Sequence, residues 1–270
     1  MLGVHRSLFY YHRKRRQRVD TERDGLRQRL RELHIASRSS AGARTLSALL
    51  RREGKPVGRY KAGRLMEEAG LVSRQPGKHR YRICERGSAL AGNSLNRCFS
   101  VREPNHVWCG DITFIRVSTG WLYLAVVLDL YARKVVGWAF SEKADSRLTQ
   151  DALTMAWNSR GQPSGLVFHS DQGSQYSSIS YRALCGRYGV TRSMSRRGNC
   201  WDNAVAERMF RSLKTEWVPA EGYGSVSEAE KDISFYLSGY YNRIRPHRNN
   251  SGLSPAEKER LHRIEPLTGS

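Results

Sequence analysis

The chain has 270 residues, of which 39% are hydrophobic and 10% aromatic, so it can build one full-size domain and one or two small ones around packed cores. Its 46 Lys and Arg residues against 25 Asp and Glu residues give a net charge of +21, concentrated in residues 1–100, which carry 24 basic and 8 acidic residues. Such an excess indicates a polyanionic partner, with nucleic acid ahead of an acidic membrane surface, and argues against a basic protein that has no nucleic-acid role.

The cysteines and the N-terminus indicate the compartment. The five cysteines are dispersed and include no CxxC pair, which is typical of reduced thiols and not of a disulfide framework or a zinc ribbon. The basic N-terminus lacks the apolar segment of a signal peptide, and the longest apolar run, Trp121–Leu128, is far too short to cross a membrane. We therefore expect a cytoplasmic protein with no membrane partner.

The first part of the chain predicts helices. Residues 1–37 form a basic helical segment, and residues 38–73 form a small all-α module. In that module, Ala43–Glu53 and Gly58–Ala69 have the apolar spacing of two short amphipathic helices, joined by a turn that contains Gly and Pro. This pattern is compatible with a helix-turn-helix that binds DNA, although other helical hairpins share it. The residues expected to contact DNA here are Arg44, Arg51, Arg52, Arg59, Lys61 and Arg64.

The pattern of apolar and polar residues changes after a basic linker at residues 74–104. Residues 105–217 predict an α/β domain with a mixed five-stranded sheet and helices on its faces, because the chain runs through three consecutive strands and then alternates helix and strand. The predicted strands cover residues 107–117, 121–131, 134–140, 166–169 and 190–194, and the predicted helices cover residues 146–158, 181–188 and 204–217. Residues 218–270 form a C-terminal extension with a helix at about residues 228–241 and a basic segment after it.

Three acidic residues of this domain are candidates for catalysis. Asp111 lies within an apolar strand, Asp171 follows another strand, and Glu207 lies in the helix at residues 204–217. A carboxylate in an apolar strand is costly unless it is paired or binds a metal, whereas a Glu on a helix is ordinarily just solvated. Together the three acids suit phosphodiester cleavage, which uses two divalent cations held by carboxylates. We therefore predict them as catalytic residues and as ligands of two Mg²⁺ ions, or of Mn²⁺, which takes the same ligands.

Four sequence blocks lie around and after these acids. They are FHSDQGSQY at Phe168–Tyr176, MSRRGNCWDNAVAERMFRSL at Met194–Leu213 with KTE at Lys214–Glu216, YNRIRPH at Tyr241–His247, and LSPA at Leu253–Ala256. These blocks resemble transposases of the insertion-sequence 3 family, and most closely the product of that family's second reading frame. Between Asp171 and Glu207 lie 35 residues, the spacing that names the D,D-35-E motif. The resemblance covers about residues 40–260 and implies the ribonuclease-H-like fold of the retroviral-integrase superfamily for the catalytic core.

The resemblance also implies a function. It indicates a DNA transposase that cleaves at the 3′ ends of an insertion sequence and transfers those ends to target DNA in metal-dependent steps. The implied partners are terminal inverted repeats, target DNA, an upstream-frame product or fusion, and further copies of the chain on DNA. Two alternatives are a nuclease of the same fold that only hydrolyses, and a non-catalytic DNA-binding regulator. The 35-residue spacing and the basic N-terminal module count against the first, and the retention of all three acids counts against the second.

Further DNA contacts are expected on the catalytic helix and beside Asp171. Lys214 follows Glu207 at i+7, where the family carries a basic residue, and we expect it to hold a DNA phosphate. Arg211, at i+4, either contacts DNA or forms a surface salt bridge. His169 alternates onto the same strand face as Asp171, so it either touches metal or DNA or is a hydrogen-bonding histidine at a strand end.

The segment before this helix and a C-terminal motif supply the remaining candidates. Arg196 and Arg197 are expected to contact the DNA backbone, and Trp201 to pack or to stack on a base. The basic residues of the YNRIRPH block either contact DNA or form a structural arginine network.

Overall fold

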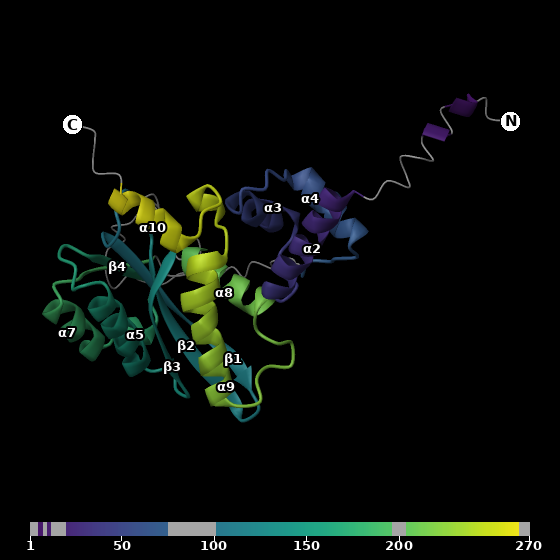
Figure 1. The fold of residues 1–270 in the computed structure, drawn as a ribbon. Coiled ribbons are helices and arrows are strands. Elements are labelled where there is room, and N and C mark those ends of the chain that lie inside the picture. The colour runs from purple at the N-terminus through teal and green to yellow at the C-terminus, as the bar shows by residue number, and fades with distance from the viewer. Residues whose placement is uncertain (1–4, 8–9, 12–19, 75–100, 196–203, 265–270) are drawn as a thin grey trace. The chain divides into compact units, whose positions relative to one another are not determined.

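The computed structural model describes residues 5–7, 10–11, 20–74, 101–195 and 204–264 (Figure 1). The chain divides into two compact units, Met1–Ser73 and Arg74–Ser270. Most of the predicted basic linker lies outside the described residues. No helix within the described ranges is both long enough and apolar enough to span a membrane.

Over the described residues 20–74, the N-terminal unit contains three helices, α2 (Thr21–Ala36), α3 (Ala43–Arg52) and α4 (Arg59–Glu68). The side chain of Asp20 caps α2 by accepting a hydrogen bond from the backbone N–H of Arg23, and Gly70, with a φ of +67°, ends the turn after α4. Helix α2 packs with the other two helices in one core, so the helical unit begins before the segment predicted at residues 38–73. The buried members of this core are Leu26, Leu30, Ala41, Leu46, Leu50, Val57, Ala62, Leu65 and Met66.

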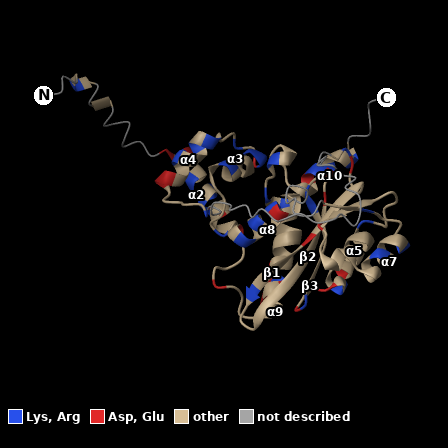
Figure 2. Cartoon of the chain, turned by 180° about the vertical axis from the view of Figure 1, so that it is seen from behind, with Lys and Arg blue, Asp and Glu red and all other residues tan. Residues whose placement is uncertain are grey.

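Ion pairs on the surface also join the helices of the N-terminal unit. Arg23 pairs with Glu68 of α4, and Arg29 pairs with Glu53 at the end of α3, with 2.7 Å between Nη2 and Oε1. All four side chains are more than a quarter exposed, and solvent screening leaves such pairs little net stabilisation. The buried leucines therefore supply most of the stability, while much of the positive charge on the surface of α2–α4 stays available (Figure 2).

The second unit contains one five-stranded sheet in the order β3-β2-β1-β4-β5. Strand β1 (Val107–Val117) pairs antiparallel with β2 (Gly120–Asp129), which pairs antiparallel with β3 (Lys134–Ser141). On its other side β1 pairs parallel with β4 (Val167–Ser170), which in turn pairs parallel with β5 (Thr191–Met194). The predicted mixed five-stranded sheet is confirmed.

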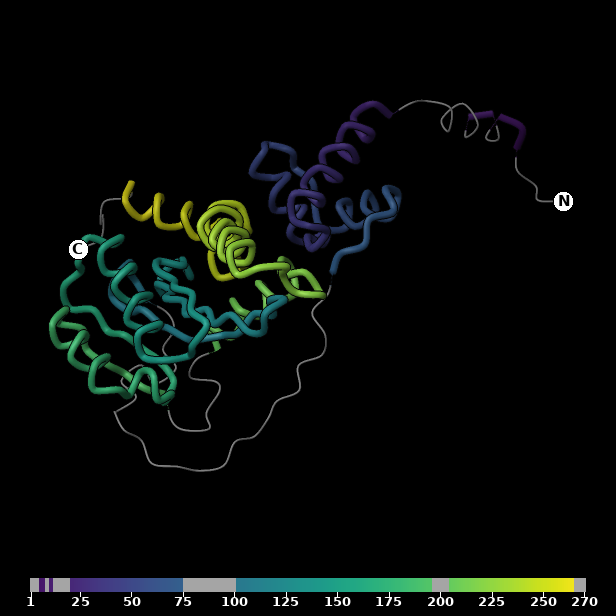
Figure 3. Tube along the Cα trace, turned by 90° about the horizontal axis from the view of Figure 1, so that it is seen from below, coloured from purple at the N-terminus to yellow at the C-terminus, as the bar shows by residue number. Residues whose placement is uncertain are grey.

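Helices cover both faces of the sheet (Figure 3). Helix α5 (Ser146–Ser159), the short α6 (Ser174–Ser177) and α7 (Ile179–Arg187) pack on one face. The catalytic-helix candidate α8 (Ala204–Glu216), α9 (Val226–Phe235) and the π-helix η2 (Tyr236–Ile244) pack on the other. Since side chains alternate along a strand, adjacent residues of β1 enter different cores: Trp108 joins the first and Cys109 the second.

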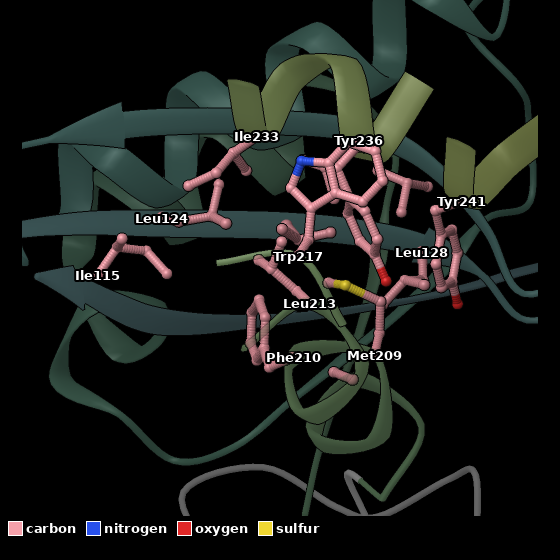
Figure 4. Packing of buried hydrophobic residues seen from close by; sticks show 14 of the residues in the cluster. Ile115, Leu124, Leu128, Met209, Phe210, Leu213, Trp217, Ile233, Tyr236 and Tyr241 are labelled. Carbon is pink, nitrogen blue, oxygen red and sulfur yellow. The ribbon is translucent and has the colours of Figure 1, made fainter. Parts of the chain in front are cut away.

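The core under α8 and α9 includes much of the predicted C-terminal extension. Met209, Phe210 and Leu213 of α8 meet the strand side chains of Ile115, Leu124 and Leu128 (Figure 4). Ile233, Tyr236 and Tyr241, from the segment after residue 217, pack into the same cluster and are at most 4% exposed. The extension is therefore part of this unit's core, because its aromatic residues cover apolar sheet surface that α8 alone leaves open.

The π-helical geometry of η2 explains how this packing is achieved. In a π-helix the backbone bonds join residues five apart, so Tyr236 and Tyr241 lie near each other, with their ring centroids 5.9 Å apart and their planes tilted by 48°. The next residue, Asn242, is buried and reaches β3, where its Oδ1 accepts from the Val135 N–H at 3.0 Å and its Nδ2 donates to the Val135 carbonyl at 2.8 Å. The pairing of β2 with β3 shifts register at this point, between Val127 and Leu128, and Asn242 satisfies the backbone there.

A buried ionic cluster fixes the last helix, α10 (Pro255–Ile264), to the sheet. Glu259 of α10 accepts from Arg160 at 2.9 Å and from Lys134 at 2.7 Å, and Arg160 also lies 3.3 Å from Asp129. Asp129 is fully buried and accepts the backbone N–H groups of Asn105 and Tyr131. Each charge therefore has a partner of opposite sign, which is the condition for keeping such groups away from water.

Replacement of Arg160 by Met is expected to lower the free energy of unfolding by about 3–5 kcal/mol, because it leaves Asp129 and Glu259 buried without their shared cation. Urea unfolding followed by circular dichroism measures this change. The control is Arg147→Met, whose pair with Asp151 is 3.9 Å long and mostly exposed, and whose loss should cost less than about 0.5 kcal/mol. If both substitutions lowered the free energy of unfolding equally, the buried ionic cluster would not have the stabilising role described for it.

Candidate active site

Two of the three predicted acids line one pocket. Asp111 and Asp171 line a pocket of about 140 Å³. Its wall consists of Asp111, Ile112, Thr113, Phe114, Tyr123, Ala144, Asp171, Gln175 and Tyr176. The sequence motifs around Asp111 and Asp171, sixty residues apart, therefore meet in space.

Strand pairing brings the two acids together. Strand β4 pairs with β1 only as far as Cys109 and His169, so Asp111 and Asp171 lie just past the last paired residues of neighbouring parallel strands. The backbone approaches closely here, since a Cβ on Gly110 would lie 2.5 Å from the ring of Phe168. Glycine at that position lets β1 sit against the aromatic residues beneath the pocket.

The electrostatics of the pocket favour a cation. Oδ1 of Asp111 accepts the N–H of Ile112 at 2.8 Å, and Oδ1 of Asp171 accepts the N–H of Gly173 at 2.9 Å. Burial first, and then the neighbouring charges of Asp171 and Glu207, raise the pKa of Asp111 to about 7, against the lowering effect of the Ile112 N–H. A bound cation would relieve both the burial penalty and the repulsion between the carboxylates.

Glu207 is exposed on α8, and its charge is among those that raise the pKa of Asp111. Within the described parts of the chain, no three His, Cys, Asp or Glu side chains lie close enough together to hold a metal ion. The Asp111–Asp171 pair alone fits the chemistry of a hard divalent cation, because it offers carboxylate oxygens of which one on each residue is engaged by a backbone N–H.

The other candidates on α8 and β4 have different surroundings. Arg211 and Lys214 are both exposed. The ammonium group of Lys214 lies 4.4 Å from the centre of the Phe114 ring, and desolvation there lowers the pKa of Lys214. His169 is fully buried, and its Nδ1 lies 3.0 Å from Oγ of Ser193 on β5. For His169 the structure therefore favours the hydrogen-bonding role over a DNA contact, since its ring has no exposed surface.

The remaining candidates fall in three groups. Arg196, Arg197 and Trp201 lie outside the described residues. The helix-turn-helix candidates are all exposed, and Nε of one of them, Arg51, also donates to the Val57 carbonyl. They are Arg44, Arg51, Arg52, Arg59, Lys61 and Arg64.

The YNRIRPH block has a structural role. Arg245 donates from Nε to Glu216 at 2.7 Å and from Nη2 to Ser212 at 3.2 Å, so it holds the C-terminal half of α8. His247 is buried with its ring 4.6 Å from that of Tyr241, and this burial lowers its pKa to about 3. For these two residues the structural network is the better explanation.

Sequence reasoning missed several residues of the pocket, notably Phe114, Tyr123 and Tyr176. Tyr176 belongs to a block that was singled out, but its buried position depends on α6. Strand alternation could have indicated Phe114 and Tyr123, which face each other across β1 and β2. Nothing in the sequence shows that α5 leaves this part of the sheet face uncovered.

Comparison with known proteins agrees with this geometry. Two family models described as an integrase core domain match residues 101–200 and 188–255, and a third, described as an HTH-like domain, matches residues 21–79. The simian T-cell lymphotropic virus intasome, in complex with the PP2A regulatory subunit B56 gamma, shares the fold, with a TM-score of 0.51 and 18% identity over 88% of this chain and 77% of that chain. The chain is thus an integrase-core protein with an N-terminal HTH-like domain.

Curated relatives then identify the family. The chain is 37% identical to the transposase InsF for insertion sequence IS3A of Escherichia coli (strain K12), over 96% of this chain and 91% of the relative. It is 36% identical to the insertion element IS600 uncharacterized 31 kDa protein of Shigella sonnei, over 98% of both chains. The chain belongs to the insertion-sequence 3 family and is a DDE transposase.

Replacement of Arg245 by Lys is expected to lower the free energy of unfolding by about 1–3 kcal/mol, because a lysine keeps the charge but has a single nitrogen in place of the Nε and Nη2 that contact Glu216 and Ser212. Thermal unfolding measures this loss. The same change at Arg248, an exposed residue of the short helix η3 (Arg248–Asn250), is the control and should leave the midpoint nearly unchanged. A midpoint for Arg245→Lys equal to that of the unaltered chain would refute this structural role.

Proposed function

We propose that the chain cleaves DNA at the 3′ ends of an insertion sequence and joins those ends to target DNA, with Asp111, Asp171 and Glu207 as its catalytic residues. The observation that carries the proposal is the shared pocket of Asp111 and Asp171, formed by neighbouring parallel strands of an integrase core. The transposase InsF, a relative along almost the whole chain, supports the reaction class.

The acids would hold two Mg²⁺ ions, or Mn²⁺, through their carboxylate oxygens. When bound, these ions activate the attacking oxygen and stabilise the leaving oxygen of a phosphodiester. Asp111 and Asp171 fit this role because both line the pocket and each has one carboxylate oxygen held by a backbone N–H. Glu207 completes the set from α8, in keeping with its electrostatic coupling to Asp111.

The same residues serve both steps of the reaction. In the first, a water oxygen bonds to phosphorus and the 3′ oxygen of the element leaves as a free hydroxyl. In the second, that hydroxyl oxygen bonds to a phosphorus of the target DNA, and a 3′ oxygen of the target leaves. Lys214, seven residues after Glu207 on α8, would hold a phosphate beside the acids and so orient the DNA for in-line attack.

The substitutions Asp111→Asn, Asp171→Asn and Glu207→Gln are each expected to reduce cleavage and strand joining by on the order of a thousandfold or more, because the amides cannot hold the cations. Labelled DNA that carries the ends of the element, incubated with the chain and Mg²⁺, resolves both products. EDTA should abolish them in the unaltered chain.

Asp151→Asn, on the exposed face of α5, is the matched control and should retain full activity. Hydrolysis without joining by the unaltered chain would favour the plain nuclease. DNA binding with no metal-dependent product, even with the upstream-frame product added, would favour the non-catalytic regulator.

The HTH-like domain is proposed to bind DNA through α4. Arg59, Lys61 and Arg64 are exposed on this helix, while Ala62 and Leu65 face the core. The helix therefore separates a basic surface from an apolar one, as a helix that lies on a DNA duplex requires.

Replacement of Arg59, Lys61 or Arg64 by Gln is expected to weaken DNA binding and to reduce the slope of log Kobs against log salt concentration by about 1 for each lost phosphate contact. Fluorescence anisotropy at several salt concentrations measures both quantities. Arg31→Gln, an exposed residue of α2, removes the same charge and should leave the slope unchanged. A slope that changes equally in this control would indicate a net-charge effect and no specific contact.

We further propose that the active species includes an upstream-frame product, separate or fused, and more than one copy of this chain on DNA. The proposal rests on the family. The assay above, run with and without that product and coupled to light scattering, measures both requirements.

A further inference from the structure

Two large aromatic side chains are exposed beside the acid pocket. Phe114 of β1 is 51% exposed and Trp121 of β2 is 53% exposed. Their ring centroids lie 5.0 Å apart with the planes at 85°, so the edge of one ring meets the face of the other. Phenylalanine and tryptophan side chains of a sheet are usually buried, so the exposure of both at one place needs an explanation.

Strand register places the pair on one face of the sheet. Phe114 is opposite Tyr123, and Arg116 is opposite Trp121, so all four side chains emerge on the same side. This is the face that α5 covers farther along the strands, where Ile112 and Tyr123 contact the core under α5. The aromatic pair therefore lies where that cover ends.

Phe114 connects the aromatic pair to the acid pocket. Phe114 and Tyr123 form part of the wall that contains Asp111 and Asp171. Lys214, from the helix of Glu207, places its ammonium group 4.4 Å from the centre of the Phe114 ring. The two acids and the Phe114 ring thus line one pocket, and the Lys214 ammonium group lies against that ring.

A nucleotide fits this order of groups. The phosphate of the nucleotide is complementary to the cation Lys214, and the adjoining phosphodiester is complementary to a metal held by the acids. The base is complementary to an aromatic ring. A base inside a duplex is already stacked on both faces, so the ring can receive only one that has left the helix. A second protein copy fits less well, because the patch is small and is flanked by the cations Arg116 and Lys214.

We propose that Trp121, supported edge-on by Phe114, stacks on a nucleobase that is unpaired from the DNA next to the scissile phosphodiester. The base contact anchors the DNA beside the acids and makes the separation of the terminal base pairs part of substrate recognition. This inference rests on the proposed function and names a substrate-positioning residue for it.

The test uses the full chain and a DNA duplex with a short single-stranded tail that contains 2-aminopurine, whose fluorescence is quenched by stacking. Binding is measured in Ca²⁺, and cutting and joining are measured separately in Mg²⁺. Trp121→Leu is expected to abolish the quenching and to weaken binding of the tailed duplex by about ten- to a hundredfold, with little effect on a blunt duplex. Trp121→Tyr should restore both, because it retains a ring.

Control variants separate stacking from folding. Phe114→Leu should weaken the quenching partially, since it removes the edge-on support while Trp121 remains. Phe235→Leu, an aromatic residue of α9 that is 58% exposed and does not line the pocket, should behave like the unaltered chain. Trp121 is half exposed, so its variants should unfold at the midpoint of the unaltered chain, and a variant that does not is replaced by Trp121→Gln.

The outcomes for this inference and for the proposed function are distinct. If the unaltered chain cuts and joins DNA while Trp121→Leu still quenches the probe and binds the tail equally well, the stacking role is overturned and the function stands. If quenching depends on Trp121 but no cutting occurs with any metal, the base contact stands and the catalytic proposal fails. A change in oligomeric state of Trp121→Leu without DNA, with unchanged quenching, would assign the patch to a second copy instead.

Discussion

The brief parallel pairing of β1 with β4 is the constraint on which the catalytic unit depends. The two strands share three register positions, Val107 to Cys109 against Val167 to His169, and then separate. Asp111 and Asp171 lie where the pairing ends, beside the resulting gap between the strands, and both line the same pocket. A longer pairing would have turned the gap into ladder hydrogen bonds, and a shorter one would have left the two strands without a fixed relative register.

The two helical layers keep this gap in place from opposite sides. Beneath it, Phe168 and Tyr176 belong to the core under α5 and α7, and Gly110 admits them by lacking a side chain. On the other side, α8 is packed on the sheet by its apolar face and held at its C-terminal half by Arg245. Repulsion between Asp111 and Asp171 is thus opposed by packing on both faces, which is how a folded chain can hold groups whose charges disfavour each other.

The sequence predicted the elements well where local pattern and tertiary environment agree. Val107–Val117 was predicted with both of its observed ends, since its β-branched residues end at a turn. The spacing of the motifs around Asp111, Asp171 and Glu207 predicted that the three acids belong to one site. In the structure, Asp111 and Asp171 line the same pocket. Three expectations stay predictions: the metal ligands, the catalytic role of Glu207 and the DNA contacts. The periodicity of a sequence does not encode where a side chain lies relative to a metal ion or to DNA.

Other features could not be predicted because they depend on contacts far apart in the chain. The π-helical turn at Tyr236–Ile244 follows from burying Tyr236 and Tyr241 together and from the bonds of Asn242 to Val135, more than a hundred residues away. Likewise the burial of His169 is set by Ser193 of a different strand. The exposure of Phe114 depends on where α5 stops, and strand alternation alone would have placed that ring inside.

The contacts of Asn242 and Glu259 with the sheet also bear on how the chain acquires its structure during synthesis. All three acids have been synthesised once residue 207 is added, yet the packing on one face of their sheet is completed only by residues up to about 259. The nascent chain therefore contains all three acids before the core that supports their sheet is complete. We expect the folded site to form only late in synthesis. A chain truncated soon after residue 207 would contain every acid but lack the residues that cover this face of the sheet, so we expect it to misfold and aggregate.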